Sequence, residues 1–171
     1  MSFMHNAPEF KEQGDRAPSM GKHQPVPPIP GNREEWEGLI ARMTPHDPKN
    51  KWYCRPHIPQ DKLDRAIRKY GSGLRHEDVL ALGDSTVFGS AEAGCLLTAG
   101  GVCCRVARGG RMVPWSEIVS ARAVGSEGIQ LRLTQGKKVR ISCGQFMLAR
   151  DRIHNLVSLV ATSNRAGLTM A

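Results

Sequence analysis

The placement of proline constrains this chain most, because proline decides where regular hydrogen-bonded structure can extend. Ten of the eleven prolines lie between Pro8 and Pro59, and the remaining one is Pro114. A proline lacks a backbone N–H and fixes φ, so a proline-rich segment cannot sustain a helix or a strand ladder for long. We therefore expect a Pro-rich, largely disordered arm over residues 1–58, and a packed domain in the C-terminal half.

One short amphipathic helix is expected inside this arm, over residues about 33–43. Asn32 can cap its first turn, with Glu35 as the second member of a capping box. Its apolar face, at i, i+3, i+4 and i+7, consists of Trp36, Leu39, Ile40 and Met43. Three turns are too few for a stable isolated helix, so this face must dock. The sequence leaves open whether it docks on the chain's own domain or on another protein.

The segment that follows contains two prolines within residues 52–59, so we expect no strand there, only aromatic side chains packed on the domain. A second helix is expected over residues 60–70, ending before Gly71. The apolar face of this helix is formed by Leu63, Ala66, Ile67 and Tyr70. This helix leads the domain, which we place at residues 59–165, and residues 166–171 are expected to be a flexible tail.

Short runs of Val, Ile, Leu and Cys alternate with glycine-containing turns from residue 77 onward. We expect seven strands, over residues 79–82, 95–98, 102–106, 111–113, 118–123, 129–133 and 139–142. An amphipathic helix follows from about residue 145 to residue 162. Short strands at a regular spacing predict an antiparallel meander that must close or pair to protect its edges. The expected fold class is therefore mainly β with helices (α+β), a seven-stranded antiparallel barrel capped by a C-terminal helix.

Three motifs in this half occur in a recognisable order. They are Asp84-x-Thr86-x-Phe88-Gly89-Ser90, Gly94-x-Leu96-Leu97-Thr98-x-x-Gly101-Val102 and Pro114-Trp115-x-x-Ile118. In this order and spacing, over residues about 77–165, the chain resembles the bacterial pleckstrin-homology-like (PH-like) domain family. The resemblance implies a PH-like barrel closed by the last helix, and it argues against catalysis. It implies no particular ligand.

Positive charge is distributed evenly, since residues 1–76 hold 13 Lys and Arg against 9 Asp and Glu, and residues 77–171 hold 11 against 7. The chain has no run of five basic residues and few aromatic residues, so we expect no nucleic-acid partner. The first loop, residues 83–92, contains two acids and no base, which makes a phosphoinositide ligand unexpected. Basic residues gather instead on two hairpins, at Arg105, Arg108, Arg111, Lys137, Lys138 and Arg140. They form either one patch for an anionic partner or ordinary solvated turn charges.

The five cysteines are an odd number without regular spacing, which predicts the reduced thiols of a cytoplasmic protein. Among them we expect Cys54 to react fastest, because it lies outside the expected strands. The sequence predicts no signal peptide and no transmembrane segment. No second ligand pair stands at zinc-site spacing beside Cys54 and His57, so no metal or cofactor is expected. The absence of a nucleophile elbow or phosphate-binding loop predicts that the chain is not an enzyme.

These observations together predict a non-catalytic protein-interaction or scaffold module. A protein partner is expected, and a bacterial adaptor or a toxin-immunity protein is one form that such a module takes. A homo-oligomer is also compatible with the sequence. The alternative is peripheral binding to anionic lipid through the basic hairpins.

Overall fold

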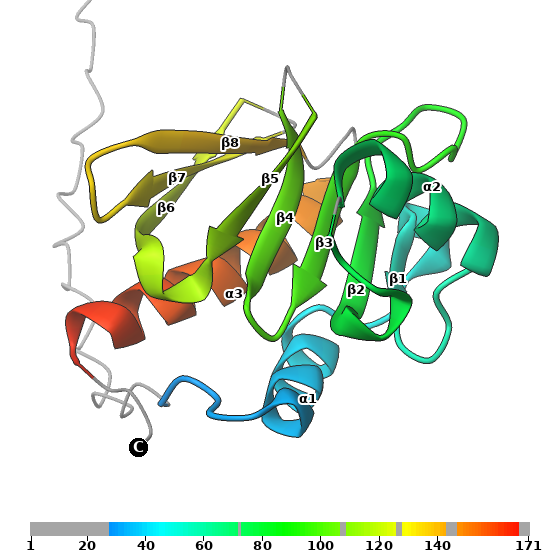
Figure 1. Ribbon diagram of the computed structural model, residues 1–171. Helices are drawn as coiled ribbons and strands as arrows, with labels where there is room; N and C mark the ends of the chain where they lie inside the picture. Colours follow the sequence, from blue (N-terminus) through cyan, green and yellow to red (C-terminus); the bar gives the residue numbers. More distant parts are fainter. Residues whose placement is uncertain (1–27, 72, 107–108, 126–127, 143–146, 168–171) are drawn as a thin grey trace, which may run out of the picture.

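The computed structural model describes residues 28–71, 73–106, 109–125, 128–142 and 147–167, with side-chain surroundings from residue 150 onward in the last range. Within these ranges the chain forms three α-helices and eight strands, which belong to two antiparallel sheets (Figure 1). Residues 1–27 of the expected arm, Arg108 and Cys143 lie outside the described residues.

The central strands of the larger sheet are buried on both faces. Its five strands, in spatial order, are β1 (Trp52–Cys54), β2 (Val79–Asp84), β3 (Gly94–Thr98), β4 (Gly101–Val106) and β5 (Gly109–Pro114). Helix α2 (Gln60–Tyr70) packs on one face, where Leu63 and Tyr70 meet Leu82 and Leu96. The other face contributes to the main core. Double coverage explains why β2, β3 and β4 are apolar almost continuously and do not alternate.

The smaller sheet is buried on one face only. Its strands are β6 (Ile118–Val124), β7 (Gly128–Leu133) and β8 (Lys138–Ser142), and helix α3 (Met147–Arg165) follows them. The inward side chains, Ile129, Leu131, Val139 and Ile141 among them, share one core with α3 and the inner face of the larger sheet. Alternate residues point away from this core, so β7 and β8 keep the apolar–polar alternation of a half-buried sheet.

The structure confirms an α+β fold with antiparallel strands and a C-terminal helix, and each of the seven expected strands is present. The expected seven-stranded barrel is not confirmed. Among the described residues the strands form two separate sheets, and no ladder joins β5 to β6. The 3-10 turn Trp115–Glu117 lies between these two strands and follows Pro114, which has no N–H to give to a ladder.

Residues 52–54 form a strand, so the expectation of no strand between residues 52 and 59 is wrong. Both prolines of that segment follow the strand, and β1 pairs with β2 through Trp52 opposite Gly83. A Cβ at Gly83 would lie 2.5 Å from the Trp52 ring, so the glycine makes room for the indole on β2. The indole N–H donates to the carbonyl of Thr44 at 2.8 Å, which ties β1 to the end of the preceding helix.

That preceding helix, α1 (Arg33–Met43), has the expected bounds, and its first turn is capped by Asn32, whose Oδ1 accepts from Glu35 N at 3.0 Å. The helix packs on α3 and β2. Trp36 stacks on Trp115 with ring centroids 5.0 Å apart and planes inclined by 13°. Part of the segment that the proline content assigned to the arm therefore contributes to the main core, through Trp36, Leu39, Ile40, Trp52 and Cys54.

Four cysteines in the described part of the chain, Cys54, Cys95, Cys103 and Cys104, are buried free thiols. The expectation that Cys54 reacts fastest is not supported by its surroundings, because its thiol donates to the Thr44 carbonyl at 3.0 Å and is shielded from solvent. Burial raises the pKa of Cys54 and of Cys103 to about 11, and that of Cys104 to about 12.

We expect these buried thiols to resist alkylation in the native protein. Raising a thiol pKa from 9.0 to about 11 lowers the thiolate fraction near neutral pH about 100-fold. Iodoacetamide labelling of Cys54, followed by mass spectrometry, should therefore be at least about 100-fold slower in the native chain than in urea. The pKa of Cys54 is higher in the folded than in the unfolded chain. The stability that comes from keeping this thiol protonated is therefore fully present below pH 9 and is lost as pH rises toward 11. Fast native labelling of Cys54 would contradict its burial.

Candidate functional site

The outer face of the smaller sheet is polar and open to solvent. The larger sheet carries α2 on one face and the main core on the other, whereas the described helices leave the outer face of β6, β7 and β8 uncovered. A rigid sheet with one free face can hold side chains at fixed spacings, and this makes the face a natural place for a binding site.

The strand registers define which side chains share this face. Ser120 lies opposite Arg132, which lies opposite Lys138, so these three form one row across the sheet. The next row, formed by Arg122, Gln130 and Arg140, lies two residues further along each strand. The third row is Val124, Gly128 and Ser142. We call the four cations of these rows, Arg122, Arg132, Lys138 and Arg140, the basic face.

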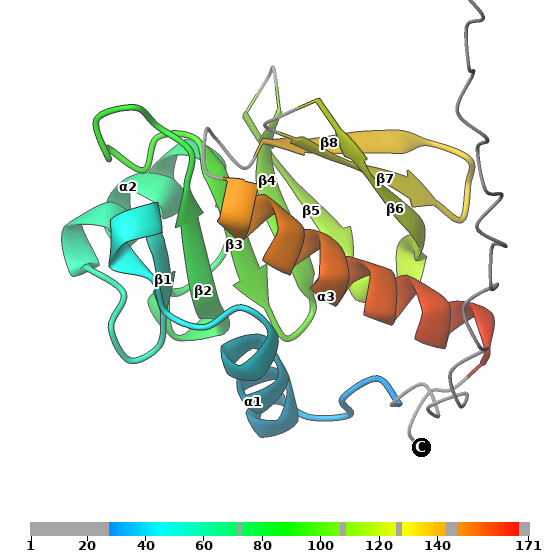
Figure 2. The ribbon, with the colours of Figure 1, turned by 180° about the vertical axis from the view of Figure 1, so that it is seen from behind.

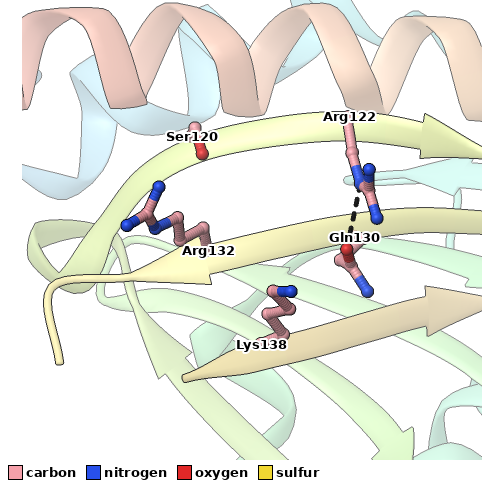
Figure 3. Close-up of a pocket in the computed structure, with 5 residues that line it drawn as sticks. All are labelled: Ser120, Arg122, Gln130, Arg132 and Lys138. Carbon is pink, nitrogen blue, oxygen red and sulfur yellow. Dashed lines mark hydrogen bonds between the residues drawn. The ribbon is translucent and has the colours of Figure 1, made fainter. Parts of the chain in front are cut away.

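The first two rows enclose a shallow hollow. Its volume is about 280 Å³, and Figure 3 shows side chains from all three strands that line it: Ser120, Arg122, Gln130, Arg132 and Lys138. Arg122 Nε donates to Gln130 Oε1 at 2.9 Å, which fixes the Gln130 amide next to a guanidinium group. The hollow therefore presents hydrogen-bond donors from the guanidinium and ammonium groups, together with one oriented amide and one hydroxyl.

A glycine at the centre of the third row helps to position Arg140. A Cβ at Gly128 would lie 2.8 Å from Arg140 Nε, so the Arg140 side chain lies across β7 in the space that a larger residue would fill. Gly128 is buried although it is on the outer face. The missing side chain leaves room for the Arg140 guanidinium group on this face, where Gln130 is the partner of Arg140 in the register.

No carboxylate compensates the basic face in the part of the chain that the structure describes. The nine positions of the three rows include no Asp or Glu, and none of the four cations forms an ion pair with another described residue. Cations elsewhere in the described chain do form ion pairs: Lys62 pairs with Asp84, and Arg152 pairs with Asp47. Like charges held close together without counter-charges produce a locally positive potential that attracts anions.

The two basic hairpins, for which the sequence left open either one shared patch or separate solvated charges, belong to different sheets. Lys138 and Arg140 are on the basic face, and Lys137 is in the exposed turn that precedes β8. Arg105 donates to the Glu92 carbonyl, whereas Arg111 pairs in register with Cys104 and so points to the opposite face of the larger sheet. The first hairpin therefore does not extend the basic face, and Arg108 lies outside the described residues.

Arg122 and Arg132 are the members of the basic face that sequence reasoning missed. The alternation Gln130-x-Arg132 and Lys138-x-Arg140 identified outward positions on each strand, and Ser120-x-Arg122 has the same form. Only the pairing of β6 with β7 shows that these positions share one face.

The apolar face expected for docking is covered within the chain itself. Trp36, Leu39 and Ile40 are buried in the main core, and Met43 packs against that core while partly exposed. The described structure therefore leaves little of this face for a partner to contact.

The described ranges contain neither a metal-binding cluster nor a membrane-spanning helix. They contain no group of three His, Cys, Asp or Glu side chains arranged as metal ligands would be. None of the described helices combines the length and the apolar character that crossing a bilayer requires. Comparison with protein-family models, with curated proteins and with solved structures finds no match to this chain.

Proposed function

We propose that this chain is a non-catalytic protein-binding module that holds an extended acidic segment of a partner on the basic face. The observation that carries the proposal is the set of four uncompensated cations on one exposed sheet face. Arg and Lys at such a face donate charge-assisted hydrogen bonds to carboxylates, and arginine can bind them in bidentate fashion.

The spacing of the cations supports an extended peptide as the ligand. Lys138 and Arg140 are two residues apart on one strand, as are Arg122 and Ser120 on another. Residues two apart on any extended chain are separated by about 7 Å, so alternate acidic side chains of a peptide match this repeat. The hollow beside Gln130 accommodates side chains that a flat surface would not.

Other anionic partners fit this face less well. Single-stranded nucleic acids are usually bound by aromatic side chains that stack on bases, and none of the nine positions is aromatic. Binding to anionic lipid through basic residues remains the second candidate, because diffuse positive charge is enough for it. The hollow and the oriented Gln130 amide favour the protein ligand.

We also propose that β2–β8 and α3 form a variant of the PH-like architecture. Seven antiparallel strands followed by a C-terminal helix is the order that the resemblance implies, and the order β2–β8 then α3 supports this assignment. Two of the motifs have structural roles that fit it: Thr86 N donates to Asp84 Oδ1 at 2.9 Å, and Trp115 Nε1 donates to the Thr98 carbonyl at 2.9 Å. An experimental structure in which the two sheets pack face to face at a small angle would contradict the assignment to the PH-like architecture.

The proposed function is tested with a fluorescent peptide in which Glu and Ser alternate, and with the matching Gln and Ser peptide. Fluorescence anisotropy should detect binding of the Glu peptide alone, and the affinity should fall as salt is raised. We expect Arg132→Gln combined with Lys138→Gln to weaken this binding about tenfold or more, because two ion pairs are lost. The matched control is Arg42→Gln combined with Arg68→Gln, which removes the same charge from exposed helix positions.

A second variant distinguishes binding at a site of defined shape from attraction by net charge alone. Gly128→Ala keeps every cation but displaces Arg140, and we expect a severalfold loss of affinity with an unchanged melting temperature. If the control pair weakens binding as much as the pair on the basic face, net charge explains the binding and the proposal fails. Binding to phosphatidylserine vesicles that depends on Arg132 and Lys138, without binding to the peptide, would establish the lipid alternative.

A further inference from the structure

The loop between β2 and β3 carries two apolar side chains into solvent at its tip. Phe88 is 97 % exposed and Val87 is 68 % exposed. Single apolar residues on a surface are common, but a phenyl ring with almost no protein contact loses the free energy of burial entirely. Glycine follows at Gly89, where a positive φ of 74° turns the chain back toward the sheet.

The loop that carries this tip is fixed by hydrogen bonds from within. The Asp84 carboxylate is buried and accepts from Thr86 N at 2.9 Å and from Thr86 Oγ1 at 2.5 Å. Thr86 Oγ1 in turn accepts from Ser90 N at 2.7 Å. Ala91 is fully buried in the cluster under α2, so the returning arm of the loop is also anchored. The tip is therefore held in one conformation while its two apolar side chains stay outside.

Two lysines from other elements complete this support. Lys51 Nζ donates to the carbonyls of Thr86 and Val87, each at 2.6 Å. Lys62 Nζ lies 3.2 Å from Asp84 Oδ2 and also donates to the Gly89 carbonyl. The backbone on either side of Phe88 is thus hydrogen-bonded to Lys51, which directly precedes β1, and to Lys62 in α2. This order lowers the conformational entropy that the loop would lose on binding.

We propose that the β2–β3 loop is a preorganised anchor that inserts Phe88, flanked by Val87, into an apolar pocket of a protein partner. A projecting aromatic side chain on a rigid support has the properties of an interface hot spot, and it fits a concave surface. Its partner therefore offers a pocket of the size of a phenyl ring, within a protein interface.

A membrane surface fits the loop less well. A membrane-binding tip needs cationic groups that are free to meet lipid phosphates, whereas Lys51 and Lys62 are engaged with the loop itself. A second copy of the chain is the other occupant that would cover the ring, and the test below distinguishes it, because it predicts an adduct of two identical chains.

This anchor is distinct from the basic face. Figures 1 and 2 show the bright-green loop between β2 and β3 at one end of the molecule and strands β6–β8 at the other. The two proposals are therefore tested independently, and failure of one leaves the other unaffected.

The test begins with photo-crosslinking in the cells that naturally make the protein. Benzoylphenylalanine replaces Phe88 in one variant and the exposed Gln135 in the control. We expect one discrete protein adduct from position 88 and none of that size from position 135. The crosslinked protein is then purified, and its affinity for the full wild-type chain and for Phe88→Ser is measured by calorimetry. The expected loss for Phe88→Ser is at least tenfold, with the melting temperature unchanged.

A second variant examines the support of the loop. Lys51→Gln keeps both apolar side chains but removes the donor that holds two backbone carbonyls, and it should weaken the same binding severalfold. The proposal is overturned if position 88 gives no discrete adduct or forms one with a second copy of the chain. It is also overturned if Phe88→Ser binds within twofold of wild type, or if Phe88-dependent binding is found with phosphatidylserine vesicles.

Discussion

Replacement of Trp36 by Ala is expected to lower the free energy of unfolding by about 3–5 kcal/mol, the usual cost of removing a buried large aromatic side chain. Trp36 is 4 % exposed and stacks on Trp115 across the junction of α1 with the main core. The cavity left by the indole is bordered by a second fixed ring, so the surroundings cannot collapse to fill it. Leu39 and Ile40 remain as buried contacts of α1 with the core, and α1 depends on such contacts because an 11-residue helix is unstable alone.

Urea denaturation followed by circular dichroism measures this loss. Phe88→Ala is the matched control, since it removes an aromatic side chain that is almost fully exposed and should change stability little. The same experiment decides between docking of α1 on its own chain and docking on a partner. An unchanged unfolding midpoint for Trp36→Ala would mean that α1 does not depend on the core in solution.

Substitution of Gly110 by Ala is expected to destabilise the protein by about 3 kcal/mol, at the upper end of the cost of overpacking. A Cβ at Gly110 would overlap the carbonyl oxygen of Tyr70 and lie 2.6 Å from its Cα. These are backbone atoms at the last residue of α2, so no side-chain rotation can relieve the overlap. Either α2 or β5 must move, and the packing of Tyr70 with Leu82 and Leu96 of the larger sheet is disturbed.

The expected fall in melting temperature, about 6–12 °C, can be followed by differential scanning fluorimetry. Gly38→Ala is the matched control, because Gly38 lies on the exposed side of α1 and a Cβ there meets nothing within 4 Å. This control should stabilise the protein by about 0.5–1 kcal/mol. A Gly110→Ala variant as stable as wild type would show that α2 does not pack on β5 as closely as described.

The helices were predictable because their signals are local. The Asn32 cap, the apolar spacing from Trp36 to Met43 and the stop at Gly71 all lie within a few residues of the elements they define. The structure accordingly has α1 and α2 with the expected bounds. The strand 52–54 has no comparable signal, because its existence depends on Gly83 and the edge of β2, thirty residues further along the chain.

The candidate site was only half predictable for the same reason. The alternation in β8 identified Lys138 and Arg140 as outward-facing, but strand neighbours cannot be read from local sequence. The pairing of Arg132 with Lys138, and of Arg122 with Gln130, brings the remaining cations to the same face. Conversely, Arg105 and Arg111 are close in sequence, yet the register of β4 and β5 directs them to opposite faces.

The contact between α1 and α3 has a consequence for how this protein is made. A ribosome releases the N-terminus first, so α1 leaves the exit tunnel before every surface that covers it has been synthesised. The ion pair that ties this region to α3 joins Asp47 to Arg152, residues 105 positions apart. The apolar face of α1 is therefore fully covered only after α3 has been synthesised. The nascent chain thus exposes part of the apolar face of α1 until α3 has been made, and a ribosome-associated chaperone would find that face accessible in this interval.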